Sequence, residues 1–150
     1  MNIKSYAADI FDSWGKEGID TISKFIEPNS GCFLLDAGCG DGKLTKFFAT
    51  KAKAGTILGL DGITRKIKGV KTIKANLNYK LPFPSNSFDV VISHFSLEHL
   101  YNSGIFISET YRILKKGGYT VVATDNLSAW PNIISLLLGW QPFSSTSGVG

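Results

Sequence analysis

Two carboxylates flank a cluster of three glycines, and this combination of residue types points to ligand-binding chemistry. The stretch 34–42 reads LLDAGCGDG, with Asp36 before the first glycine and Asp41 between the second and the third. It ends an apolar run and precedes an amphipathic pattern that begins near Lys43. Glycines at such a strand–turn–helix corner let the backbone adopt positive φ and approach a ligand at the helix N-terminus. The corner is therefore typical of a nucleotide-binding site.

The charge of this corner separates it from a dinucleotide site. Asp36 and Asp41 would repel a pyrophosphate and attract a cation. The glycines also depart from the G-x-G-x-x-G fingerprint, because Lys43 occupies the place of its third glycine. S-adenosylmethionine, which carries a sulfonium and an ammonium group, is the common cofactor that fits. The alternative is an ordinary glycine turn after a strand.

Strands alternate with helices along the chain, which predicts right-handed βαβ crossovers. We therefore expect an α/β fold, a Rossmann-like doubly wound and mostly parallel sheet with helices on both faces. A helical segment is expected over residues 5–27, with a break near Gly15 and Gly18. The predicted strands are 32–36, 56–60, 70–75, 88–93 and 119–124; the predicted helices are 43–53 and 105–114, the second ending in a turn over Lys115–Gly118.

Polar residues that end these strands are the candidate ligand contacts, because ligands of open parallel sheets bind beyond the carboxyl ends of the strands. Asp61 follows the second strand and could accept hydrogen bonds from both hydroxyls of a ribose; the alternative is a turn aspartate before Gly62. Asn76 and Leu77 follow the third strand and could contact an adenine, although a plain loop asparagine is an equally open interpretation.

Histidine and cysteine provide weaker signals. His94 follows the fourth strand and could line the pocket, and its spacing to His99 is weak evidence for zinc. The two cysteines, Cys32 and Cys39, match neither a disulfide framework nor a zinc site. No metal is therefore predicted, and a reducing, cytoplasmic setting is expected.

Charge and hydropathy argue against a nucleic-acid-binding protein and against a membrane-spanning one. The net charge of +4 is concentrated in residues 31–80, which hold ten Lys and Arg against three Asp. Aromatic residues are not interleaved with these cations as a base-stacking surface requires, so a solvated basic face is favoured. No signal peptide is visible, and the apolar run from Ile133 to Trp140 is too short to cross a bilayer.

The chain resembles the class I S-adenosylmethionine-dependent methyltransferases of the small-molecule type, the methyltransferase type 11 group. Five segments in the expected order carry the resemblance over roughly residues 30–125. They are Leu34–Gly42, Gly59–Asp61, Leu81–Val91 (LPFPSNSFDVV), Ser96–Leu100 (SLEHL) and Tyr111–Gly118 (YRILKKGG).

The resemblance implies a cofactor site and a reaction. Asp36, Gly38 and Gly40 would surround the methionine part of the cofactor, Asp61 its ribose, and Asn76 with Leu77 its adenine. Cys39, Gly62 and His94 complete the predicted cofactor-binding set. A substrate nucleophile would attack the methyl carbon in line with sulfur while the protein positions the reactants and excludes water. Glu98 and His99 are the candidate general bases, but capping and orienting their own segment is the favoured interpretation, so no catalytic residue is assigned.

The family fold has seven strands, whereas residues 126–150 contain no pattern for two more. We expect one S-adenosylmethionine-binding domain over 1–150: an N-terminal helical segment (1–30), a cofactor-binding core (31–125) and the start of a substrate-side region (126–150). The chain would be a fragment truncated at its C-terminus, or its sheet would be incomplete. Self-association is then expected through the fifth strand or through an exposed apolar patch over residues 127–143.

The expected function is methyl transfer to a small-molecule or glycan-like acceptor. One alternative is a domain that binds the cofactor but is inactive and serves regulation or interaction. The other is an NAD-dependent oxidoreductase.

Overall fold

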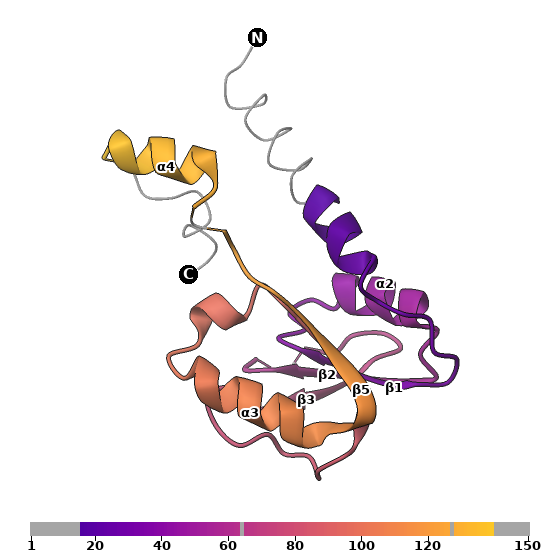
Figure 1. Cartoon of the computed structure of the whole chain (residues 1–150). Helices are drawn as coiled ribbons and strands as arrows, with labels where there is room; N and C mark the ends of the chain where they lie inside the picture. The colour runs from indigo at the N-terminus through magenta and orange to yellow at the C-terminus, as the bar shows by residue number, and fades with distance from the viewer. Residues whose placement is uncertain (1–15, 64, 127, 140–150) are drawn as a thin grey trace.

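The computed structural model describes residues 16–63, 65–126 and 128–139, and Figure 1 shows their arrangement. Five parallel strands form one sheet in the order β3-β2-β1-β4-β5. The strands are β1 Phe33–Ala37, β2 Thr56–Asp61, β3 Lys71–Lys74, β4 Phe88–His94 and β5 Leu114–Ala123. The chain order reverses between β1 and β4, and this switch point is where a doubly wound sheet binds its ligand. The predicted fold class is confirmed.

Helices cover both faces of the sheet (Figure 1). On one face, α2 (Lys43–Ala52) and the helical residues 16–23 pack Phe48, Ala52 and Ile22 against the strands. On the other face, α3 (Ser103–Ile113) contributes Phe106 and Ile113 to a second buried cluster. The central strands β1 and β4 are buried on both sides because each face has its own apolar layer. The predicted first helix was wrong in two respects within the described residues: the helix over 16–23 passes through Gly18 without a break, and it ends at residue 23 rather than at 27. Its part before residue 16 lies outside the described residues.

The fifth strand departs from its predicted bounds. Residues 115–118, expected to form a turn after the helix, belong to β5, which begins at Leu114 directly after α3. Pairing with β4 shifts register there, so that Phe88 faces Leu114 and Val90 faces Tyr119. Gly118 allows this irregularity because a Cβ at its position would lie only 2.8 Å from the Asp89 carbonyl oxygen. Gly117 and Gly118 therefore mark a bulge within a strand rather than a helix terminus.

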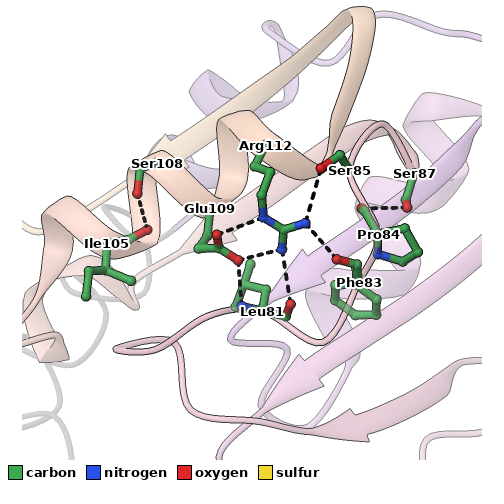
Figure 2. A network of polar contacts seen from close by, with 9 residues as sticks. All are labelled: Leu81, Phe83, Pro84, Ser85, Ser87, Ile105, Ser108, Glu109 and Arg112. Carbon is green, nitrogen blue, oxygen red and sulfur yellow. Dashed lines mark hydrogen bonds and ion pairs between the residues drawn. The ribbon is translucent and has the colours of Figure 1, made fainter.

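An arginine on α3 holds the proline-containing loop between β3 and β4 (Figure 2). The Arg112 guanidinium donates to the carbonyl oxygens of Phe83 at 2.8 Å and Leu81 at 3.2 Å, and to both Glu109 carboxylate oxygens. Glu109 also accepts a hydrogen bond from the Leu81 amide at 2.8 Å. Two of the segments that carry the family resemblance, 81–91 and 111–118, are therefore one structural unit.

The sheet edge and the last helix are both exposed. No residue of the edge strand β5 is fully buried. Beyond its carboxyl end, α4 (Trp130–Leu137) lies clear of both faces of the sheet (Figure 1). Five of its apolar side chains are exposed, as the predicted apolar patch requires: Trp130, Ile133, Ile134, Leu136 and Leu137. Leu127, Trp140 and Phe143 of that patch lie outside the described residues. The area of the patch stays a prediction.

Removing Arg112 should destabilise the fold because Glu109 and two carbonyl oxygens would lose their donor. We expect Arg112→Met to lower the free energy of unfolding by about 2 kcal/mol. Urea denaturation monitored by circular dichroism measures this change. The control is Lys116→Met, which removes an exposed cation four residues on and should change stability by less than about 0.5 kcal/mol. Equal effects of the two substitutions would contradict the role of the network.

Candidate cofactor-binding site

The glycine turn after β1 is tightly enclosed. The amides of Gly38 and Cys39 both donate to the Leu60 carbonyl oxygen, at 2.7 and 3.1 Å, which fastens the turn to the end of β2. Gly38 has φ +93°, and a Cβ there would lie 1.9 Å from the Ser96 hydroxyl oxygen of the loop after β4. Only glycine combines this backbone conformation with so close an approach. The turn therefore has neighbours on both sides that determine its path.

Asp61 is positioned by the same turn. One of its carboxylate oxygens accepts a hydrogen bond from the Gly40 amide at 2.9 Å, and the other accepts from the Ile63 amide at 2.9 Å. A carboxylate offers about four acceptor positions, so each oxygen keeps capacity for a further donor. The arrangement presents an oriented pair of acceptors to the space above the turn, as two neighbouring hydroxyl groups of a ligand would need.

A cavity of about 770 Å³ opens at the carboxyl edge of the sheet, beside the turn and Asp61. Its volume lies in the range of small-molecule sites. Six residues predicted from the sequence line it: Gly38, Gly40, Asp61, Gly62, Asn76 and Leu77. The structure thus brings together the ends of β1, β2 and β3, as the topology implied.

Asn76 has a definite partner at the cavity wall. Its side-chain oxygen accepts from the amide and the side-chain nitrogen of Asn78, at 2.9 and 3.0 Å. Asn78 in turn accepts from the amide of Asn102, which caps α3 by accepting from Ile105. This chain of asparagines ties the loop after β3 to the start of α3. The side-chain nitrogen of Asn76 remains the group with which it could contact a ligand.

Three predicted residues do not line the cavity. Asp36 is buried beneath the turn with 3% exposure, where the Thr45 hydroxyl donates to it at 2.5 Å. Burial, with a smaller contribution from Asp61, raises the pKa of Asp36 to about 6. Cys39 points toward Gly59, and burial raises the pKa of its thiol to about 11, so the thiol stays protonated at neutral pH.

The third is His94, whose ring packs against Phe48 and Phe95 with centroids 6.0 and 4.0 Å apart. Burial lowers its pKa, which favours the neutral imidazole. Of the two candidate general bases, His99 lines the cavity. The other, Glu98, accepts a hydrogen bond from the Thr124 hydroxyl at 3.1 Å. Among the described residues, no group of three or more His, Cys, Asp or Glu is placed to hold a metal ion.

Six lining residues were not predicted: Arg65, Lys74, Ala75, Phe95, Ser96 and Leu100. Phe95 has φ +50°, a conformation that non-glycine residues adopt rarely and that is enriched at functional sites. The sequence signal for this position was its place directly after β4, together with His94. Arg65 and Lys74 were counted only as part of a basic face, because loop paths decide which cations reach a cavity.

Fold and site together define a class I methyltransferase domain: a doubly wound parallel sheet with a carboxylate-bearing, glycine-walled cavity at its carboxyl edge. A family model described as a methyltransferase domain matches residues 35–122, more than half of the chain, and the chain belongs to this family.

Two methyltransferases from other organisms are similar to this chain in sequence. A probable S-adenosylmethionine-dependent methyltransferase of Mycolicibacterium smegmatis is 32% identical over 103 residues, covering 65% of this chain and 39% of that protein. A ubiquinone biosynthesis O-methyltransferase of Pelagibacter ubique is 26% identical over 133 residues, covering 79% of this chain and 55% of that protein. The chain thus spans about two fifths to just over half of these relatives.

A solved structure shows the same fold. An S-adenosylmethionine-dependent methyltransferase from Mesorhizobium loti superposes with a TM-score of 0.63 at 23% identity, covering 71% of this chain and 53% of that chain. Among the residues that the structure describes, no helix is long and apolar enough to cross a membrane.

Replacing Gly38 should disrupt the cavity wall. Gly38→Ala places a methyl group against Ser96 and forces alanine into positive φ, so we expect a loss of about 2 kcal/mol or more in the free energy of unfolding. The double variant Gly38→Ala/Ser96→Gly removes the clash but not the backbone cost, and should recover part of the loss. Gly62→Ala is the control, since a Cβ at that position would meet nothing within 4 Å and its φ is not positive. Thermal and urea denaturation measure all three; an undiminished Gly38→Ala stability would contradict the packing described.

Ionisation of Asp36 should cost stability near neutral pH. Because its pKa in the folded chain, about 6, lies above the ordinary value of 3.8, its contribution to stability is fully present below pH 3.8 and lost as pH rises through 6. Asp36→Asn avoids this ionisation and can still accept from Thr45. We expect it to raise the free energy of unfolding at pH 7 by up to about 3 kcal/mol and to have little effect near pH 4. Asp41→Asn, at an exposed carboxylate whose pKa is lowered by hydrogen bonds from Lys43, should show no such gain.

Proposed function

We propose that the cavity binds S-adenosylmethionine and that the chain takes part in methyl transfer to a small-molecule or glycan-like acceptor. The observation that carries this proposal is the carboxylate of Asp61, oriented by the glycine turn in a cavity of cofactor size. Its two unused acceptor positions suit the two hydroxyls of a ribose. Relatives described as S-adenosylmethionine-dependent methyltransferases and the family membership of residues 35–122 support the cofactor.

Each part of the cofactor has a proposed neighbour. The methionine part would lie over Gly38 and Gly40, above the buried negative charge of Asp36, which attracts its cationic groups through a low-dielectric interior. The ribose would lie at Asp61 and Gly62, and the adenine at Asn76 and Leu77. Cys39 and His94, which face away from the cavity, would act on the cofactor only by supporting the turn and the end of β4.

Transfer would proceed by direct displacement. An acceptor nucleophile forms a bond to the methyl carbon while the carbon–sulfur bond breaks, and sulfur leaves as a neutral thioether. If the nucleophile is a hydroxyl, its proton must pass to a base or to water. His99 lines the cavity and is the better placed of the two candidate bases, since Glu98 is directed toward Thr124. The pairing of Glu98 with Thr124 supports a structural role for that residue.

Isothermal titration calorimetry with S-adenosylhomocysteine tests the cofactor site. We expect saturable binding that Asp61→Asn weakens about tenfold or more, because its charged hydrogen bonds to the ribose are lost. Asp41→Asn is the matched control, since its carboxylate is exposed and pairs with Lys43 outside the cavity. NADH binding more tightly than S-adenosylhomocysteine would overturn the proposal in favour of an oxidoreductase.

A radiolabelled methyl donor separates the enzyme from a binding module. The chain would be incubated with hydroxyl, amine and carboxylate acceptors, and labelled product would be counted. Product that depends on Asp61 supports transferase activity. Saturable cofactor binding with no labelled product in any acceptor class would favour the inactive, regulatory alternative.

A further inference from the structure

The hydroxyl of Ser96 is a buried polar group at the wall of the cavity, directly beside the glycine turn. Ser96 is only 8% exposed yet lines the cavity, and its Oγ would lie 1.9 Å from a Cβ at Gly38. The next residue near that position is Leu77, whose side-chain carbon would lie 4.0 Å from the same Cβ. A ligand that lies over Gly38 therefore meets the Ser96 hydroxyl on one side and an apolar carbon on the other.

This hydroxyl keeps hydrogen-bonding capacity that the fold does not use. It donates to the His94 carbonyl oxygen at 3.3 Å, which is longer than an ordinary O–H···O hydrogen bond of about 2.5–3.0 Å. Ser96 also precedes the short helical turn Leu97–His99, but its side chain caps no amide of that turn. Because a hydroxyl oxygen has two acceptor lone pairs, Oγ can accept a donor from the cavity while its own hydrogen is directed to His94.

The backbone on both sides of Ser96 fixes where the hydroxyl lies. Phe95 has φ +50°, and its amide donates to the Ala123 carbonyl oxygen at 2.9 Å, so the chain bends after β4 while it is still attached to β5. The Ser96 carbonyl oxygen accepts from the His99 amide at 3.2 Å. A non-glycine residue with positive φ costs free energy and persists only where its surroundings enforce it, which is frequent at ligand sites. The strained residue therefore belongs to the segment that brings Ser96 to the turn.

The surroundings of the Ser96 hydroxyl suit a cationic donor rather than an anion. Its neighbour in the hydrogen bond, the His94 carbonyl oxygen, is an acceptor, and the carboxyl of Asp36 is buried beneath the same turn. The arginine and lysine that line the cavity come from the other side of β1: Arg65 precedes β3 and Lys74 ends it. The α-ammonium group of S-adenosylmethionine is the part of the proposed cofactor that is both a donor and a cation.

We propose that the Ser96 hydroxyl accepts a hydrogen bond from the α-ammonium group of the cofactor's methionine part. This inference rests on the proposed function and adds to it a residue outside the glycine turn. Asp61 would then hold the ribose, and Ser96 the opposite end of the cofactor. The sulfur and its methyl group lie between these two ends, so holding both of them orients the methyl group for attack.

Calorimetric titration with three adenosine thioethers tests this contact. S-adenosylhomocysteine carries the amine and the carboxylate, its decarboxylated form carries the amine alone, and methylthioadenosine carries neither. Ser96→Ala should weaken binding of the first two about tenfold, because each loses a hydrogen bond to a charged group, and should leave methylthioadenosine binding unchanged. Ser93→Ala is the matched control. It removes a buried hydroxyl from the same segment, one that has no hydrogen-bond partner among the described residues and does not line the cavity, so all three affinities should stay the same.

The pattern of losses separates this inference from its rivals. A loss confined to S-adenosylhomocysteine would assign Ser96 to the carboxylate instead and overturn the ammonium contact. Equal losses for all three ligands would show that Ser96 only shapes the cavity, and unchanged affinities would show no contact at all; both results overturn the inference while the proposed function stands. Failure of the unsubstituted chain to bind any of the three would instead overturn the proposed function, and the inference with it.

Discussion

The glycine turn after β1 passes through a narrow space between the end of β2 and the loop after β4, and the site depends on this constraint. Leu60 holds two successive amides of the turn, and Ser96 occupies the space that a side chain at residue 38 would need. Both neighbours exist because β1 lies between β2 and β4 in the sheet. The strand order thus creates the narrow passage, and the glycine allows the chain to use it. Asp61 then receives its orientation from the same turn through the Gly40 amide.

Much of the fold could be predicted from the sequence because its signals are local. Apolar runs indicated the buried strands, and helical periodicity indicated α2 and α3. The site residues that follow strands, such as Asp61 and Leu77, were also predictable, since parallel topology brings strand ends to one edge. Arg65 and Lys74 were not, because their approach to the cavity depends on the path of loops. Ser96 became significant only through its contact with Gly38.

Two differences between prediction and structure have simple physical reasons. His94 shares a face with Ile92 because side chains alternate along a strand, and this face packs toward Phe48 rather than into the cavity. The glycines at 117 and 118 resembled a helix end, yet the close approach of β5 to Asp89 explains Gly118.

The proline-containing loop shows how a distant residue can complete a local structure. Pro82 and Pro84 have no amide hydrogen, so this loop has few donors of its own for its carbonyl oxygens. Arg112 supplies donors to two of them from α3. Glu109 keeps the guanidinium in place and accepts the Leu81 amide. The loop and the helix are therefore expected to unfold together, which places α3 and the start of β4 in one cooperative unit.

The buried carboxyl of Asp36 also couples the cavity to the solvent's acidity. With a pKa of about 6, this group carries a proton in roughly half of the molecules at that pH. A cation held above it would expel the proton, which the buffer would then take up. The heat of association near pH 6 should therefore vary with the ionisation enthalpy of the buffer, and the slope of that variation counts the protons released per bound cation.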